Sequence, residues 1–162
     1  MKIDKIYLDM DGVIADFDAH FENLYGMVSR EYEDKFSTYR FWEKVYETPN
    51  FFSTMPVTPW FWTLFELCKS VKVPIVILSS PSRVNTPLCM IEKRKWVDSY
   101  LGGTFPAIFE KEKHKYAGEG RLLIDDQKDK CDKWTQAGGI AHQFTTIELF
   151  TKFICEVLSG NR

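Results

Sequence analysis

The stretch that most constrains this chain is residues 6–17, which read IYLDMDGVIADF. An apolar run leads into two carboxylates one residue apart, Asp9 and Asp11, and then Gly12 precedes a second apolar run. This pattern is typical of a buried strand that ends abruptly in a loop. Alternate side chains of an extended chain share a face, so Asp9 and Asp11 are expected to point the same way.

Two carboxylates on one face repel each other unless a positive charge lies between or beside them. A hard divalent cation with oxygen ligands offsets that repulsion, and Mg²⁺ is the ion that fits best. The alternative is a strand that runs into an ordinary acidic turn. Because no polar spacer precedes Asp9, and Gly12 lets the backbone turn close to a bound group, we interpret residues 9–12 as a metal or phosphate site.

Length and composition are those of a folded soluble domain. The 162 residues suffice for one domain with a sizeable core. A net charge of −2 without a long basic tract argues against binding of extended nucleic acid, whereas a small nucleotide remains compatible. The four cysteines form no C-x-x-C pair, and no signal peptide or membrane-spanning run is present, so we expect a cytoplasmic protein with free thiols and no membrane contact.

The apolar runs predict alternating strands and helices. Helices are expected over residues 14–25, 58–70, 86–101, 130–136 and 145–158, and strands over 6–8, 73–78, 105–109, 122–124 and 140–144. Thr58 is expected to cap the second helix, and Pro106 to place its strand at a sheet edge. The core-facing side of the third helix is expected to contain Leu88, Ile91, Lys95 and residues 97–101. Helices between successive strands favour an open parallel α/β sheet, in which ligands bind beyond the carboxyl ends of the strands.

Residues 27–57 interrupt this alternation with a polar segment that carries scattered aromatic side chains. We interpret it as a small, mostly helical cap inserted after the first strand. The predicted division is an α/β core of residues 1–16 and 71–162, with the cap and its return helix at residues 17–70. Aromatic residues make up 15% of the chain and cluster between Phe36 and Phe65, so the cap is where their excess needs an explanation.

Polar side chains follow three of the predicted strands, at residues 9–11, at 79–80 and at 125–126, and Lys93 lies in the helix after the second of them. A carboxylate can attack phosphorus when a cation offsets the charge of the nucleophile and the phosphate. A hydroxyl and an ammonium can hold the remaining phosphate oxygens. These parts suffice for transfer of a phosphoryl group to a protein aspartate and then to water.

These segments resemble, in order, the four motifs of the haloacid dehalogenase (HAD) superfamily of phosphatases. The matching segments are D-M-D-G-V at 9–13, Ser79 after an apolar strand, Lys93, and Asp125-Asp126 after another apolar strand. Within that superfamily the chain is most similar to the 5'(3')-deoxyribonucleotidases, through DMDGVIADF at 9–17, NFF at 50–52, SSP at 79–81 and LLIDD at 122–126. The resemblance covers residues 6 to about 145 and implies a HAD-like α/β fold, an open Rossmann-like parallel sheet flanked by helices.

The resemblance implies a Mg²⁺-dependent phosphatase of nucleoside monophosphates, with 5'(3')-deoxyribonucleotides foremost, that works through an aspartyl phosphate. Asp9 would be the nucleophile, and Asp11 would protonate the leaving oxygen and later activate water. Mg²⁺ would be held by the Asp9 carboxylate, the Asp11 backbone carbonyl and Asp125, with Asp126 in support.

The same resemblance implies a phosphate site made by Ser79, Ser80 and Lys93, and a substrate site for a small nucleotide. Serine stands at 79 where threonine is common in the family, which keeps the hydroxyl. The implied substrate-binding residues are Phe17, Phe41, Trp42, Tyr46 and Arg83. An aromatic core that only stabilises the cap is the alternative for the four aromatic residues. Base, sugar, the position of the phosphate and the oligomeric state stay open, a homodimer included.

Three other functions use related parts. A phosphatase of the same superfamily can act on another small phosphate ester or on a nucleic-acid 3' phosphate. Receiver domains of signalling relays hold an aspartyl phosphate as a switch, but there the acidic pair and the phosphorylated aspartate lie on separate strands, and an aromatic cap has no role. A chain that keeps the fold and only binds a partner is disfavoured because every motif residue here is chemically competent.

Overall fold

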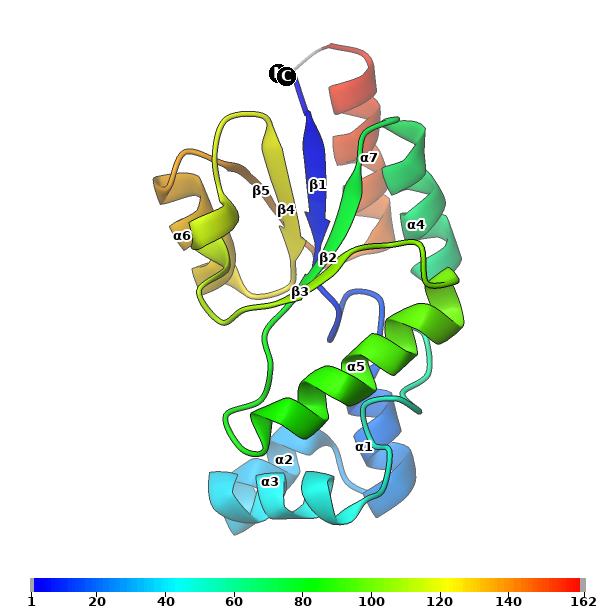
Figure 1. Ribbon diagram of the computed structural model, residues 1–162, viewed down its shortest axis with the longest axis vertical. Helices are drawn as coiled ribbons and strands as arrows, with labels where there is room; N and C mark the ends of the chain where they lie inside the picture. The colour runs from blue at the N-terminus through cyan, green and yellow to red at the C-terminus, as the bar shows by residue number, and fades with distance from the viewer. Residues whose placement is uncertain (1, 161–162) are drawn as a thin grey trace.

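The computed structural model describes residues 2–160 and contains one parallel sheet of five strands, in the order β3-β2-β1-β4-β5 (Figure 1). The strands are β1 (Lys5–Leu8), β2 (Ile75–Ser79), β3 (Ala107–Phe109), β4 (Arg121–Asp125) and β5 (Ile140–Gln143). Every predicted strand is present, and β3 lies at an edge as Pro106 predicted. Because β1 lies between β2 and β4, the loop after β1 meets the ends of both neighbours.

Helices connect the strands. They are α1 (Phe17–Tyr25), α2 (Ser29–Phe36), α3 (Thr38–Glu47), α4 (Phe61–Ser70), α5 (Thr86–Leu101), α6 (Lys128–Gln136), α7 (Ile147–Leu158) and the short 3-10 helix η1 (Lys113–Tyr116). Figure 1 shows α4 and α7 together on one side of the sheet and α6 on the other, while α1, α2 and α3 lie beyond the carboxyl ends of the strands. This arrangement is the predicted open α/β sheet with helices on both faces.

The sheet is buried on both faces, which is why its strands are almost continuously apolar. On one face Ile6 and Leu8 belong to the large core that also contains side chains of α4 and α7. On the other face Tyr7 packs edge-to-face on Trp134 of α6, with 5.1 Å between ring centroids. Complete burial of one such large apolar side chain contributes about 1.5–3 kcal/mol, so these two layers hold the sheet ends in place.

Helices α1, α4 and α7 begin later than the sequence predicts, α7 by only two residues, at Ile147. Helix α1 begins at Phe17 and not at residue 14, because residues 10–15 form a tight loop and the Asp16 carboxylate accepts the N-cap hydrogen bond from Ala19 N at 3.0 Å. Helix α4 begins at Phe61, and the predicted cap residue Thr58 instead donates its hydroxyl to the carbonyl of Val13 at 3.0 Å. Thr58 therefore anchors the loop after β1.

Helix α5 has the predicted bounds, and Val97 and Leu101 of its predicted inner face are buried, but the first two turns of that face are wrong. Leu88 and Ile91 are 37% and 55% exposed, whereas Glu92 and Lys93 are 5% and 1% exposed. The cause is the position of α5 between the sheet and the cap, where its polar side chains have partners (Figure 1). Glu92 accepts a hydrogen bond from the backbone N–H of Phe52 at 2.9 Å.

The cap has an aromatic centre. Phe21 is fully buried and lies 4.6, 5.3 and 5.0 Å, between ring centroids, from Tyr25, Tyr32 and Phe41. Part of the aromatic excess thus stabilises the cap itself. The division of the chain at residues 17 and 70 stays a prediction, and because α4 packs against α7 we propose that the cap ends before α4. Within residues 2–160, no helix is long and apolar enough to cross a membrane.

Candidate active site

The carboxyl ends of three neighbouring strands bring the predicted polar residues together. Leu8 of β1 pairs with Ile77 of β2 and Ile124 of β4, so the residues that follow meet at one edge of the sheet. The backbone N–H of Asp9 donates to the carbonyl of Ile124 at 2.9 Å, which fixes Asp9 beside Asp125. Asp9 and Asp125 are 4% and 0% exposed.

The loop after β1 is held in a single shape by hydrogen bonds to its own backbone. The carbonyl of Met10 accepts from the N–H groups of residues 13, 14 and 15 at 3.2, 2.9 and 2.8 Å. Gly12 has a φ of +78°, and a Cβ at that position would lie 2.8 Å from Oδ2 of Asp126. Glycine is therefore required here both by the left-handed backbone and by the close approach of a carboxylate.

Three carboxylates converge at this edge of the sheet. Oxygen atoms of Asp9, Asp125 and Asp126 lie within 4.8 Å of one another. Lys113 lies against two of them, with its Nζ 2.6 Å from Oδ1 of Asp9 and 2.6 Å from Oδ2 of Asp125. One ammonium against three carboxylates leaves an excess of negative charge, which suits a divalent cation with oxygen ligands.

Lys113 was not among the residues predicted from the sequence. It begins η1 within the highly charged segment of residues 110–115, EKEKHK, where no pattern separates it from its neighbours. Its side chain is 2% exposed. Burial lowers the pKa of Lys113, but attraction by Asp9 and Asp125 outweighs burial and raises it overall, so the side chain stays charged.

The two carboxyls after β4 are hard to ionise in the metal-free chain. Burial, and then the charge of Asp9, raise the pKa of Asp125 to about 6 even though Lys113 opposes the shift. Burial, and then the charges of Asp9 and Asp125, raise the pKa of Asp126 to about 7. A cation bound at these carboxylates would favour their ionised forms.

These pKa values predict how stability depends on pH. An aspartate in an unfolded chain has a pKa of about 3.9, so between pH about 4 and 7 the folded metal-free chain holds more protons at Asp126 than the unfolded chain does. The free energy of unfolding should therefore fall, relative to Asp126→Asn, as the pH rises through that window. Urea unfolding of both proteins in EDTA at several pH values measures this difference. A difference that stays constant or grows in favour of the wild type contradicts the assignment.

The predicted phosphate-binding residues also meet. Lys93 Nζ donates to Oδ2 of Asp11 at 2.5 Å, to Oγ of Ser79 at 2.9 Å and to the carbonyl of Ser80 at 3.0 Å. Three buried oxygens nearby have no hydrogen-bond partner among the described residues, namely Oδ1 of Asp11, Oγ of Ser80 and Oδ1 of Asp126. A buried polar atom without a partner costs about 1–3 kcal/mol, so these oxygens fit the contacts of a metal ion and a phosphate.

Two cavities open onto Asp11. The first, of about 430 Å³, is lined by Phe17, Phe41 and Trp42 together with Asp11 and the Asp126 side of the carboxylate cluster. The second, of about 540 Å³, is lined by Ser80, Lys93 and Arg83 and shares Trp42 with the first. The structure thus places four of the five predicted substrate-binding residues next to the carboxylates.

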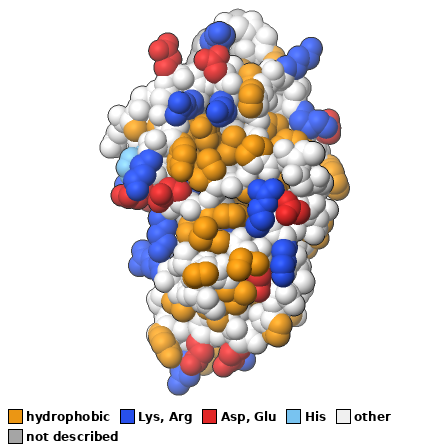
Figure 2. All heavy atoms as spheres, in the orientation of Figure 1, with side chains coloured by type: hydrophobic (Ala, Val, Ile, Leu, Met, Phe, Trp, Pro, Cys, Tyr) orange, Lys and Arg blue, Asp and Glu red, His pale blue; other side chains and the backbone are white. Residues whose placement is uncertain are grey.

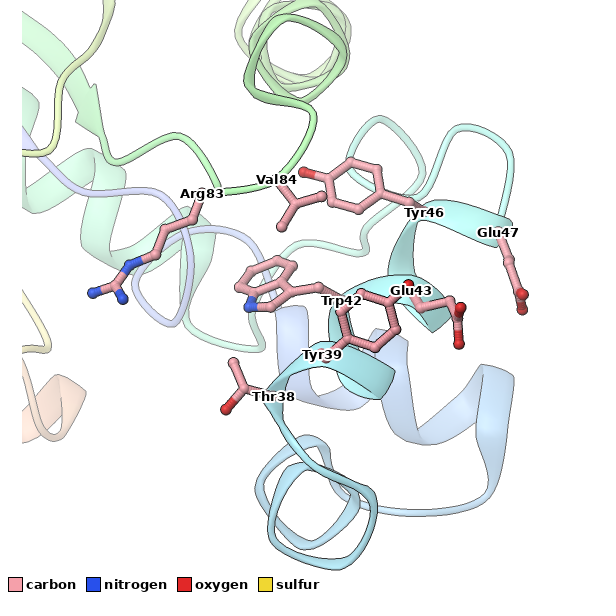
Figure 3. Close-up of a pocket in the computed structure, with 8 residues that line it drawn as sticks. All are labelled: Thr38, Tyr39, Trp42, Glu43, Tyr46, Glu47, Arg83 and Val84. Carbon is pink, nitrogen blue, oxygen red and sulfur yellow. The ribbon is translucent and has the colours of Figure 1, made fainter.

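Tyr46 is the exception. It lines neither cavity that contains Asp11 but a third one, of about 560 Å³, which shares Trp42 and Arg83 with the second. Figure 3 shows Tyr46 beside Val84 in this third pocket, with the guanidinium of Arg83 pointing away from Tyr39 and Tyr46. The hydroxyl of Tyr46 is hydrogen-bonded to that of Ser82, which ties α3 to the loop after β2.

Comparison with solved structures identifies the fold as that of the HAD superfamily. A hydrolase from Streptococcus pneumoniae superposes with a TM-score of 0.57 at 19% identity, over 96% of this chain and 100% of that one. A HAD family enzyme from Bacteroides thetaiotaomicron, solved with magnesium and inorganic phosphate, superposes with a TM-score of 0.54 at 15% identity, over 91% of this chain and 99% of that one. At these identities the likeness concerns the fold.

A curated relative is similar in sequence. It is a protein of Vibrio phage KVP40 named "Putative 5'(3')-deoxyribonucleotidase", 28% identical over 129 residues, which are 78% of this chain and 69% of the relative. No family model matches the chain. The fold and this relative together confirm the resemblance to HAD superfamily phosphatases that the motifs predicted.

Proposed function

We propose that this chain is a Mg²⁺-dependent phosphatase of the HAD superfamily that hydrolyses nucleoside monophosphates through an aspartyl phosphate. One observation carries the proposal. The buried carboxylate of Asp9 contacts Lys113 and belongs to the acidic cluster, and Lys93 joins Asp11, two residues further along the chain, to Ser79. This arrangement at one edge of the sheet supports the assignment of a nucleophile, a cation site and phosphate donors.

In the proposed first step, a carboxylate oxygen of Asp9 attacks phosphorus. The bond from phosphorus to the sugar oxygen breaks, its electron pair stays on that oxygen, and Asp11 supplies the proton that makes it a hydroxyl. Oδ1 of Asp11 has no partner among residues 2–160, so it is available for that transfer. Lys93 now contacts Asp11, Ser79 and Ser80, and the phosphate of the substrate would share its ammonium.

In the second step, the Asp11 carboxylate takes a proton from water while the water oxygen attacks phosphorus. The bond between phosphorus and Asp9 breaks, which releases inorganic phosphate and restores the Asp9 carboxylate. When bound, Mg²⁺ would be held by Asp9, the Asp11 carbonyl and Asp125, with Asp126 in support, and would offset the charge of nucleophile and phosphate. Lys113 would keep its contact with Asp9 and orient the carboxylate.

Nucleotides are the substrate class that the aromatic cavity favours. Phe17, Phe41 and Trp42 border the cavity next to the carboxylates, where a base joined to the sugar of the substrate can stack. The named activity of the Vibrio phage relative supports deoxyribonucleotides within that class.

Trp42 is expected to contribute to substrate binding because it borders both cavities that contain Asp11. Loss of one base-stacking side chain costs about 1–3 kcal/mol, so Trp42→Ala should raise KM for dTMP or dUMP by about 5- to 150-fold. Trp42→Phe should recover part of the effect. Tyr39→Ala is the matched control, since Tyr39 lies on the same helix and is 72% exposed. An unchanged KM in Trp42→Ala would remove the stacking role.

The proposed function is tested by a panel of substrates with Mg²⁺ and with EDTA. The panel contains deoxy and ribo nucleoside 5'- and 3'-monophosphates, sugar phosphates and a generic aryl phosphate. We expect Mg²⁺-dependent phosphate release with the highest kcat/KM on nucleoside monophosphates. Release that is fastest on sugar phosphates would contradict the substrate class, and no release from any phosphate ester would contradict the phosphatase.

A further inference from the structure

The second cavity is more basic than the cleavage of one phosphate requires. Its charged lining residues are the cations Arg83, Lys93, Lys111 and Lys130 and the carboxylates Asp11 and Glu33. Lys93 is paired with Asp11, so three cations remain against Glu33 in a chain whose net charge is −2. Figure 2 shows Lys and Arg side chains, with Asp and Glu side chains beside some of them, along the side of the molecule on which α6 lies, above the cap. This local excess of positive charge favours an anionic ligand.

Lys111 and Lys130 lie together although they come from different segments. Lys130 of α6 is half-buried, and its Nζ donates to the backbone carbonyl of Lys111 at 3.1 Å. Within the described chain, neither lysine has a carboxylate within 4.0 Å. Two other lysines of α6 do have carboxylate partners, since Lys128 Nζ is 2.6 Å from Oδ2 of Asp132 and Lys133 Nζ is 4.0 Å from Oδ2 of Asp129.

A smaller cavity adjoins the second one at these two lysines. It has a volume of about 170 Å³, and Lys111 and Lys130 line it together with His114 and Lys133. Its one lining carboxylate, Glu112, is held 2.6 Å from Lys115. Lys130 and the exposed Lys111, neither of which has a carboxylate partner, therefore line a space with a surplus of donors, and a phosphate there would accept hydrogen bonds from them.

We propose that Lys111 and Lys130 form a second phosphate subsite, so that the preferred substrate carries a second phosphate besides the one that is cleaved. This inference rests on the proposed function. The chemical class is a nucleotide phosphorylated on both its 3' and 5' oxygens, or the phosphorylated end of a short oligonucleotide whose next phosphodiester occupies the subsite. Arg83, across the same cavity, supplies a further positive charge. A volume of about 540 Å³ is within the range of ligand pockets and exceeds what one phosphate fills.

The test measures binding separately from turnover. The protein carries Asp9→Asn to prevent cleavage, and calorimetric titration with Mg²⁺ compares dTMP, thymidine 3',5'-bisphosphate and the 5'-phosphorylated dinucleotide of thymidine. We expect the bisphosphate to bind about 10-fold or more tightly than dTMP, because a charge-assisted contact contributes at least about 1.4 kcal/mol. Adding Lys111→Gln and Lys130→Gln should abolish most of this ratio. Lys128→Gln with Lys152→Gln removes the same charge from exposed positions on α6 and α7 that line neither cavity, and it should keep the ratio.

Each outcome decides the inference. Tight binding of the bisphosphate alone assigns the subsite to a terminal phosphate, and equally tight binding of the dinucleotide extends it to a phosphodiester. Equal affinity for dTMP and the bisphosphate, no binding of either, or equal loss of the ratio in the control pair overturns the subsite. Phosphate release from dTMP by the unmodified chain reports separately on the proposed function, so the two failures are distinguishable.

Discussion

Asp9→Asn is expected to lower Mg²⁺-dependent phosphate release by a factor of about 10⁴ or more while the chain stays folded, because loss of a catalytic nucleophile has effects of this size. Asparagine has the shape of aspartate and keeps an oxygen that accepts from Lys113 Nζ, now 2.6 Å from Asp9. It lacks the carboxylate that attacks phosphorus. Initial rates on the best substrate of the panel, with circular dichroism and urea unfolding of the same samples, measure both parts.

The matched control for this variant is Asp98→Asn, which makes the same change at an exposed residue of α5 paired with Arg94. The control should keep wild-type rates. Activity of Asp9→Asn within about 10-fold of wild type would exclude Asp9 as the nucleophile. Loss of a general acid or base alone lowers rates by about 10²–10⁴, so a smaller loss leaves no essential chemical role for Asp9.

Lys113→Met is expected to destabilise the metal-free chain by about 3–5 kcal/mol, the usual cost of removing one partner from a buried ion pair. Methionine fills a similar volume, so the loss reflects charge. Without the ammonium, the buried carboxylates of Asp9 and Asp125 face each other with no cation between them. The free energy of unfolding in urea with EDTA measures this effect.

Mg²⁺ is expected to restore part of that stability, because an ion that binds the folded chain stabilises it in proportion to the logarithm of its concentration over Kd. The gain on adding Mg²⁺ should be larger for Lys113→Met than for the wild type. Lys115→Met is the control, since Lys115 is 53% exposed and exposed pairs contribute about 0–1 kcal/mol. Equal losses of unfolding free energy in Lys113→Met and Lys115→Met would show that the Lys113 ammonium does not offset the charges of the buried carboxylates.

Much of the fold follows from short-range sequence patterns. Each strand is a buried apolar run, and the positions of Asp9, Ser79 and Asp125 directly after such runs predict that they meet at one edge of a parallel sheet. The register of β1 with β2 and β4 confirms that meeting. These predictions succeed because a strand buried on both faces has little freedom in its pattern.

The rest depends on contacts between distant segments. Lys113 is surrounded in sequence by other charged residues. It becomes buried because the fold brings η1 to the carboxyl ends of β1 and β4, where Lys113 contacts Asp9 and Asp125. The prediction for α5 holds at Val97 and Leu101 but fails at Leu88, because Glu92 and Lys93 find buried partners, which outweighs the preference of Leu88 for the core.

The cap shows the same limit for aromatic residues. Composition places them in one segment, but helix packing decides their roles. Phe21 fills the centre of the cap, Trp42 lines both cavities at Asp11, and Tyr46 lines neither but is hydrogen-bonded to Ser82, which lines the second of them. Trp42 and Tyr46 lie one turn apart on α3, with 6.3 Å between ring centroids, yet only Trp42 lines the cavities that contain Asp11, and nothing in the spacing of the aromatic residues indicates which of the two does so.

The most direct test of a covalent phosphoenzyme is the stereochemical course at phosphorus. A nucleoside thiophosphate ester made chiral with one oxygen isotope is hydrolysed in water enriched in another, and the configuration of the released thiophosphate is determined. Attack by Asp9 followed by attack of water inverts phosphorus twice, so we predict net retention of configuration. Net inversion would mean that water attacks the substrate directly, and it would contradict the aspartyl phosphate.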